Sequence, residues 1–124
     1  MKKLNCHCGI VEVEINFPET GFKVIKCNCS ICKRKGAIMS MVKNEDFKIT
    51  KGEKKLKLYQ FHTKVAKHYF CSNCGIYTHH NPRSNPAMTG FNLGCLDEVD
   101  TFKLENVGIN DGHNHPLDKK NESI

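Results

Sequence analysis

The chain has 124 residues, of which 39% are hydrophobic and 26% charged, and its formal net charge is +6. No stretch approaches the roughly 18 apolar residues of a membrane span, so we expect no membrane partner. The opening Met-Lys-Lys is followed at once by Asn5 and a cysteine rather than by the apolar core of a signal peptide, which predicts a cytoplasmic protein. The length fits one zinc-binding domain over residues 1–118, with a disordered tail over 119–124.

Short segments with strand character dominate the chain. Hydrophobic residues alternate with polar ones from Val11 to Phe17, where Pro18 ends the pattern. Further strands are predicted at 22–25, 36–42, 47–50, 55–60, 65–70 and 91–95, and the proline-containing segment 81–87 predicts a loop. No segment longer than a turn or two has the 3.6-residue period of a helix. We therefore expect a mainly β fold of antiparallel sheets, with cysteine motifs in its turns.

Seven of the eight cysteines fall into three tight motifs, which are Cys6-His7-Cys8, Cys27-Asn28-Cys29-Ser30-Ile31-Cys32 and Cys71-Ser72-Asn73-Cys74. Such spacing indicates metal ligation, because thiolates bind Zn²⁺ and prefer a tetrahedral set of four. Gly9 and Gly75 follow two of the motifs, as expected where the backbone must turn beneath a metal with a positive φ. Zinc is the commoner occupant of such motifs, although iron is an alternative.

The number of ligands favours two zinc sites of different kinds. We expect Cys6, Cys8, Cys71 and Cys74 to form a closed structural site, because two pairs of cysteines complete one tetrahedron. The middle motif then forms an open site that is one ligand short. Spacing alone leaves other pairings open: Cys29 and Cys32, for example, could pair with either outer motif.

Two alternatives concern the cysteines and the charge. Eight cysteines could form four disulfides, but a reduced cytosol disfavours this, and cysteines two residues apart bridge each other badly.

Zinc bound by thiolates also lowers the net charge, since a four-thiolate zinc contributes about −2 and a three-thiolate zinc about −1. The loaded protein is then only mildly basic, at about +3, and nucleic acid is not an expected partner.

The open site, Cys27, Cys29 and Cys32, could bind a small thiol and deprotonate it. The adjacent run Lys33, Arg34 and Lys35 could hold the carboxylates of an anionic thiol, or it is simply a solvated charge run. Cys95 could supply a fourth ligand, but its alternation with Phe91 and Leu93 favours a buried core thiol. His79 and His80 could provide a ligand or a proton shuttle, although ordinary strand or loop histidines are the preferred interpretation.

The order Cys-x-Cys-Gly, Cys-x-Cys-x-x-Cys and Cys-x-x-Cys-Gly resembles the glutathione-dependent formaldehyde-activating enzyme family, which includes the centromere protein V group. Phe91-Asn-Leu-Gly-Cys-Leu-Asp97 is similar to the strand that follows the zinc motifs in that family, and Asp111-Gly-His-Asn-His-Pro116 is similar to its closing segment. The resemblance spans about residues 5–117.

The resemblance implies a complex fold of several coiled antiparallel sheets held together by cysteine-bound zinc. It implies a structural zinc on the first and last motifs and a second zinc on the middle motif. It also implies a carbon–sulfur lyase that joins glutathione and formaldehyde as S-(hydroxymethyl)glutathione.

We therefore expect an enzyme that acts on glutathione, or a similar small thiol, and an aldehyde. The alternative class is a non-catalytic, zinc-stabilised module that binds protein or nucleic acid. A redox or metal sensor is a third, because an under-coordinated thiolate cluster is easily oxidised.

Overall fold

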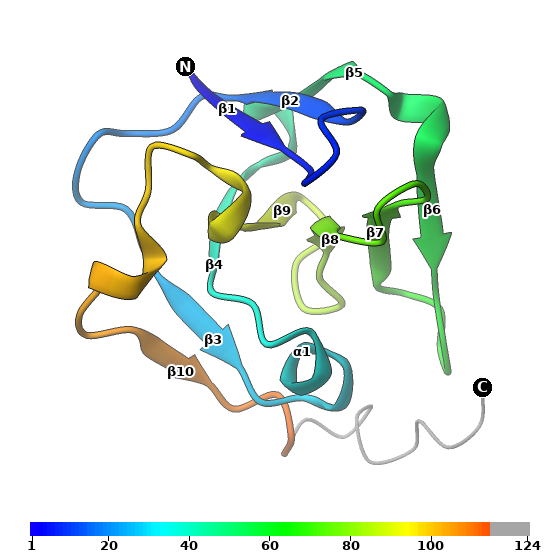
Figure 1. The fold of residues 1–124 in the computed structure, drawn as a ribbon. Coiled ribbons are helices and arrows are strands. Elements are labelled where there is room, and N and C mark those ends of the chain that lie inside the picture. Colours follow the sequence, from blue (N-terminus) through cyan, green and yellow to red (C-terminus); the bar gives the residue numbers. More distant parts are fainter. Residues whose placement is uncertain (115–124) are drawn as a thin grey trace.

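The computed structural model describes residues 1–114 as two β-sheets, one short α-helix and four 3₁₀ turns (Figure 1). Its elements are β1 (Lys2–Asn5), β2 (Glu12–Ile15), β3 (Ile25–Cys27), α1 (Ser30–Lys35), β4 (Met39–Lys43), β5 (Phe47–Lys51), β6 (Leu56–Tyr59), β7 (Lys67–Cys71), β8 (Tyr77–Asn81), β9 (Met88–Asn92) and β10 (Gly108–Asn110). The mainly β class is confirmed. The predicted tail at 119–124 and the domain end at residue 118 lie outside the described residues.

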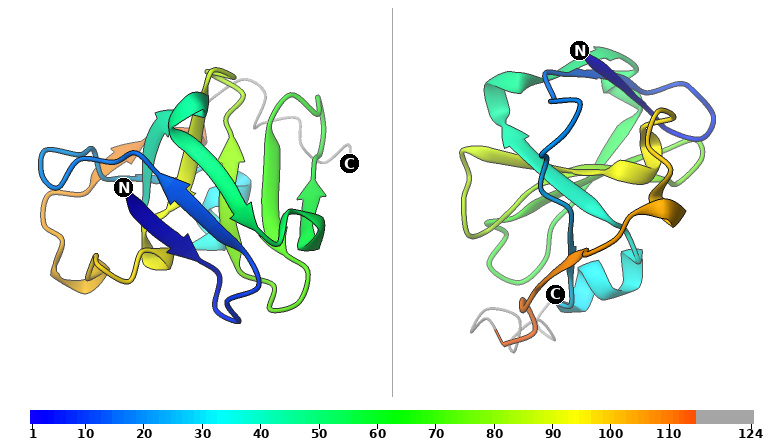
Figure 2. Two further views of the ribbon diagram at one scale, coloured as in Figure 1. Left: turned by 90° about the horizontal axis from the view of Figure 1, so that it is seen from above. Right: turned by 90° about the vertical axis from the view of Figure 1, so that its left-hand side faces the viewer.

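A three-stranded sheet of order β1-β2-β5 and a seven-stranded sheet of order β10-β3-β4-β9-β8-β7-β6 make up the fold. All pairings are antiparallel except that of β10 with β3, which is parallel. Figures 1 and 2 show the smaller sheet at one end of the molecule and α1 at the opposite end. The helix is therefore placed away from the smaller sheet, beside the ends of β3 and β10.

The main core lies where the smaller sheet packs against the centre of the larger one. The alternation predicted from Val11 to Phe17 is confirmed, because Val11, Val13 and Ile15 are fully buried and Phe17 nearly so. Phe17 meets Phe91 of β9 edge to face, with ring centroids 5.3 Å apart. Cys6, Cys71 and Cys95 belong to this same core, which confirms Cys95 as a buried thiol.

Some predicted strands end elsewhere. The predicted strand 91–95 stops at Asn92, whose side chain accepts a hydrogen bond from the Gly94 backbone N–H and starts a 3₁₀ turn over Leu93–Cys95. Leu58 of β6, the edge strand of the larger sheet, is 48% exposed. β1 was not predicted: it begins with two lysines, and Lys2 is buried because Glu19 and Glu98 accept hydrogen bonds from its ammonium group at 2.9 and 2.7 Å.

Gly52, with φ +76°, connects β5 to the turn before β6 and lies against the first cysteine motif's loop. A Cβ at Gly52 would lie 2.2 Å from the Ile10 carbonyl oxygen, whereas a Cβ at Gly21, with φ +78°, would contact nothing within 4 Å. We expect Gly52→Ala to lower the free energy of unfolding by more than about 3 kcal/mol, because backbone must move as well as adopt the left-handed region. Gly21→Ala should lower it by only about 1 kcal/mol.

Urea denaturation of the zinc-loaded variants measures both values. Equal losses for the two variants would show that the close approach of Gly52 to Ile10 contributes nothing to stability.

Candidate metal and thiol site

Two separate groups of cysteines have sulfur atoms close enough to hold a metal ion. One contains Cys6, Cys8, Cys71 and Cys74, and the other contains Cys27, Cys29 and Cys32; within each group the sulfurs lie within 4.8 Å of one another. This is the grouping predicted from the sequence. All eight cysteines are free thiols, so the disulfide alternative is wrong.

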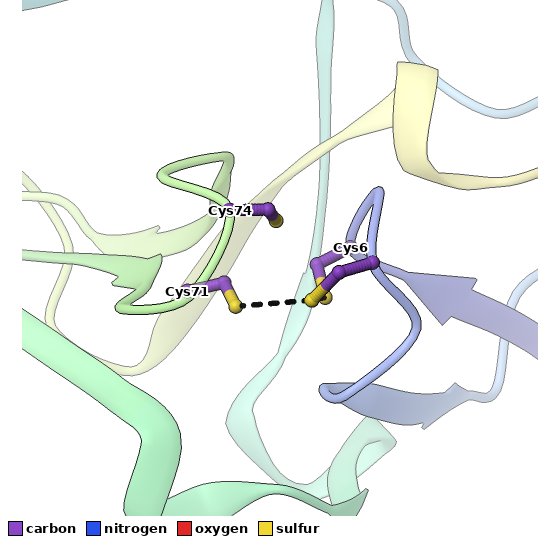
Figure 3. A group of neighbouring side chains, drawn as sticks. Cys6, Cys71 and Cys74 are labelled. Atoms are coloured by element: carbon purple, nitrogen blue, oxygen red, sulfur yellow. Dashed lines mark hydrogen bonds between the residues drawn. The ribbon is translucent and has the colours of Figure 1, made fainter.

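The first group joins two loops that are far apart in the chain. Cys6 and Cys8 lie in the turn between β1 and β2. Cys71 ends β7 and Cys74 lies in the turn that follows it; Figure 3 shows both beside Cys6. Both turns are closed by a glycine: the Gly9 N–H donates to the Cys6 carbonyl at 3.1 Å, and the Gly75 N–H donates to the Cys71 carbonyl at 2.8 Å. The φ angles of Gly9 and Gly75 are +80° and +78°, which confirms the predicted turn conformation.

The sulfur positions of this group fit a tetrahedral zinc ion. The Sγ atoms of Cys6 and Cys8 are 3.6 Å apart, and those of Cys8 and Cys71 are 3.7 Å apart. Four sulfurs at about 2.3 Å from one zinc ion would be separated from each other by about 3.8 Å. The backbone N–H of Val11 also donates to the Cys6 Sγ at 3.3 Å, a contact that stabilises a thiolate.

Hydrogen bonds and burial act in opposite directions on the pKa values of this group. The Asn73 side chain and the Ile10 backbone N–H donate to Cys8, and they lower its pKa to about 6. Burial raises the pKa of Cys71 to about 11. Cys6 and Cys71 are buried in the core while Cys8 is exposed, and four thiolates this close together need a cation among them.

The second group is positioned by the end of β3 and the start of α1. Cys27 ends β3, Cys29 is the N-cap of α1, and Cys32 lies one turn into the helix. Gly36, with φ +64°, ends the helix by donating its N–H to the Cys32 carbonyl. Cys29 and Cys32 are each 7% exposed, and they pack with Met39 of β4 in a second, smaller core.

The closing segment after β10 lies directly on this second group. The Asn110 side chain donates to the Cys27 Sγ at 3.5 Å. A Cβ at Gly112 would lie 2.7 Å from the Cys27 Sγ and 2.8 Å from the Cys29 Cβ, so only glycine allows this approach. Asn28 fixes the segment, because its side chain donates to Asp111 at 3.2 Å and accepts from the His113 N–H at 2.8 Å.

Negative charge in the second group concentrates on Cys27. The thiols of Cys29 and Cys32 donate to the Cys27 sulfur and hold its pKa well below the usual range. The same contacts, together with burial, raise the pKa of Cys32. Three neighbouring thiols cannot all ionise without a cation, which is the condition that a divalent metal would satisfy.

All three cysteines of the second group line a cavity of about 330 Å³. The wall contains apolar side chains, two buried histidines, two cations and a carboxylate. They include Met39, Met41, Phe61, His68, His80, Lys23, Arg83 and Asp111. Among the described residues, the cysteines of the first group are not part of this lining.

The three residues of the predicted cation run, Lys33, Arg34 and Lys35, do not face the same way. Lys33 and Arg34 are exposed, and the Arg34 guanidinium donates to the Ser30 carbonyl within the helix. Lys35 turns inward, with its Nζ 2.8 Å from His68 Nδ1 and 3.7 Å from the centroid of the Tyr77 ring. Sequence reasoning missed Lys23, His68 and Arg83, which come from separate elements and share no motif.

Two comparisons with known proteins bear on the chain. A family model described as glutathione-dependent formaldehyde-activating enzyme matches residues 1–108. The chain belongs to this family. A crystal structure of a Rhodobacter sphaeroides protein is similar, with 42% sequence identity and a TM-score of 0.82 over 87% of this chain and 99% of that one. The family match includes all seven clustered cysteines but ends before the closing segment at 109–114. Within residues 1–114, no helix is long and apolar enough to cross a membrane.

Replacing one core thiol tests the role of the first group. We expect Cys71→Ser to unfold or aggregate, because it removes a ligand from the ion that joins the two turns, and structural zinc contributes folding energy directly. Cys95→Ser is the matched control: Cys95 is also buried but lies outside both groups, and the variant should keep the fold and the metal content. Circular dichroism and zinc analysis by mass spectrometry measure these outcomes. A folded Cys71→Ser protein with an unchanged zinc content would contradict the assignment.

Proposed function

We propose that the protein is a zinc-dependent carbon–sulfur lyase that joins an aldehyde such as formaldehyde reversibly to the thiol of glutathione or a similar small thiol. The observation that carries the proposal is the difference between the two cysteine groups. One has four sulfurs and joins two turns away from the cavity, and the other has three sulfurs and lines a cavity large enough for a small molecule. Closed sets are typical of structural zinc sites and open sets of catalytic ones.

In this proposal Cys6, Cys8, Cys71 and Cys74 hold a structural zinc ion, and Cys27, Cys29 and Cys32 hold a second ion in the catalytic site. When bound there, zinc would lower the pKa of a substrate thiol, so that the thiolate is available at neutral pH. The chain's own contribution is to exclude water and fix the cysteines. Asn110 and Gly112 of the closing segment contact the cysteines on one side, and α1 positions Cys29 and Cys32 on the other.

The cavity also supplies charges that suit a thiol carrying carboxylate and ammonium groups. Lys23 and Arg83 line it, and Arg83 donates to the Gly112 carbonyl at 3.2 Å beside the cysteines. Asp111, on the same wall, is an acceptor for an ammonium group. These positions favour Lys23 and Arg83 over Lys33 and Arg34 as the groups that hold the carboxylates of glutathione.

The first experiment measures zinc content and glutathione binding together. We expect two zinc ions per chain, and glutathione binding that Cys29→Ser abolishes while Cys95→Ser retains it. Exchange of ¹³C-formaldehyde between its hydrate and S-(hydroxymethyl)glutathione, followed by NMR, should be faster with the wild-type protein than without it. Two zinc ions indifferent to glutathione, with no binding and no faster exchange, would instead support a zinc-stabilised binding module.

The cation assignment has its own test. We expect Arg83→Gln to weaken glutathione binding about tenfold, because a hydrogen bond to a charged group contributes about 1.5–3 kcal/mol. Arg34→Gln, which removes the same charge from the exposed face of α1, should leave binding unchanged. Isothermal titration with glutathione and with the uncharged thiol 2-mercaptoethanol distinguishes lost charge recognition from a damaged site. Weaker glutathione binding in Arg34→Gln alone would favour the run after Cys32.

A further inference from the structure

The closing segment, residues 109–114, covers one side of the second cysteine group. β10 brings it there by pairing in parallel with β3, so that Asn110 is opposite Cys27 in the strand register (Figure 1). Gly112 is buried, although the residues on both sides of it are exposed. The segment therefore packs one glycine against the cysteines and leaves its other residues in contact with solvent.

Asn28, between the first two cysteines of the middle motif, holds this segment by three hydrogen bonds. Its backbone N–H donates to the Asn110 carbonyl at 3.2 Å. Its side-chain Nδ2 donates to Asp111 Oδ1 at 3.2 Å, and its Oδ1 accepts from the His113 N–H at 2.8 Å. An amide supplies a donor and an acceptor on separate atoms, so asparagine satisfies both side-chain contacts at once, whereas an aspartate could only accept.

The segment approaches the cysteines so closely that a side chain cannot be added. A Cβ at Gly112 would lie 2.7 Å from Cys27 Sγ and 2.8 Å from Cys29 Cβ. The φ of Gly112 is not in the left-handed region, so glycine is needed here for space and not for backbone conformation. Gly108 of β10 provides a contrast, because a Cβ there would lie 3.6 Å from the Val24 carbonyl oxygen, an ordinary contact.

Asn110 interacts directly with one of the sulfurs. Its Nδ2 donates to Cys27 Sγ at 3.5 Å, and Arg83 donates to the Gly112 carbonyl at 3.2 Å, which holds the segment from another side. Groups that form hydrogen bonds to metal ligands fix the orientation of those ligands, and their loss typically weakens metal affinity about 10–100-fold. The closing segment has this relation to the second cysteine group.

We propose that the closing segment, held by Asn28, is the outer shell of the second metal site and sets how tightly the three cysteines retain an ion. The inference rests on the second ion of the proposed function, and it does not require lyase activity. Asn28, Asn110 and Gly112 are positioning residues in this proposal, because they act on the ligands and not on the reacting atoms.

The proposal accounts for the retention of an ion by an open set of ligands. Three sulfurs leave one position of a tetrahedral ion unfilled, so the protein ligands alone hold it less firmly than a closed set of four would. Hydrogen bonds and packing around the ligands compensate by keeping the sulfurs in place. Asn110, Asp111 and Gly112 also line the cavity, so one segment both supports the ligands and borders the space that a substrate would enter.

Asn28→Asp tests the attachment of the segment without changing the size of the side chain. The variant loses the donor to Asp111 and places a second carboxylate beside it, which should repel the segment. We expect the second group to bind zinc about tenfold more weakly in competition with pyridylazoresorcinol, while the first group keeps its wild-type affinity. Asn16→Asp is the matched control, because Asn16 Nδ2 donates to Asp46 Oδ1 at 3.3 Å and neither residue lines the cavity.

Gly112→Ala tests the close approach by an independent change. With ¹¹³Cd in place of zinc, NMR should give a separate signal for each cysteine group. We expect Gly112→Ala to move the signal of the three-sulfur group, because the added Cβ displaces Cys27 or the segment itself, and to leave the four-sulfur signal unchanged. Gly108→Ala makes the same substitution in an uncrowded position and should leave both signals unchanged.

Hydrogen exchange distinguishes an outer shell from a segment that only stabilises the fold. In Asn28→Asp, the amides of residues 109–114 should exchange faster than in the wild type. The amides of β1 and β2, which lie in the smaller sheet, should keep their protection. Loss of protection in both regions would show a general loss of structure and would overturn the proposal.

The outcomes also separate this inference from the proposed function. Unchanged zinc affinity of the second group in both Asn28→Asp and Gly112→Ala would overturn the outer shell, and so would an equal loss of affinity at both groups. A wild-type protein that binds a single zinc ion would overturn the second site and its outer shell together. The expected losses of affinity in a protein that does not accelerate formaldehyde exchange would refute the lyase function and support the outer shell.

Discussion

The sulfur of Cys71 is completely buried, and it lies 3.7 Å from the sulfur of Cys8, sixty-three residues away in the chain. The other structural features of the molecule depend on this contact. It joins the β1–β2 turn of the smaller sheet to the β7–β8 turn of the larger one, so the two sheets are fixed relative to each other at their shared core. Thiolates in such a core are stable only around a cation. A cation bound by the four sulfurs would add its binding energy to the folded state.

The strands β7 and β8 on either side of this turn pair in a register that shifts once, between Tyr69 and Phe70. Tyr69 opposes His79 and His68 opposes His80, so one histidine of β8 faces the main core and the next faces the cavity. His79 packs against Phe47 and Tyr69 on the core side, whereas His80 reaches Tyr77 on the other. A shift by one residue would exchange these environments. The register of β7 and β8 thus decides which imidazole of β8 meets the second cysteine group.

Much of this architecture could be predicted from the sequence, for identifiable physical reasons. The segment Val11–Phe17 alternates because one face of its strand is buried, and the cysteine motifs group as expected because four thiolates complete a tetrahedron. The wall of the cavity could not be predicted in this way. His68 and Lys35 meet only because β7 lies beside β8 and α1 folds back toward them, and this contact leaves no periodicity in the chain. Lys35 looks like its neighbours Lys33 and Arg34 in the sequence, but its helical position turns it inward.

The polar side chains beside the cavity are buried at a cost in free energy, and this cost points to a function. An apolar wall would line the cavity at lower cost, since each buried polar group must be compensated by a hydrogen bond. Here Lys35, His68, Tyr77 and His80 satisfy one another in two pairs, and Gly90 gives up a side chain so that one ring fits. A network of this kind adds little to stability over hydrophobic packing, whereas it fixes the orientation of two imidazole rings in the wall of the cavity that the three cysteines also line.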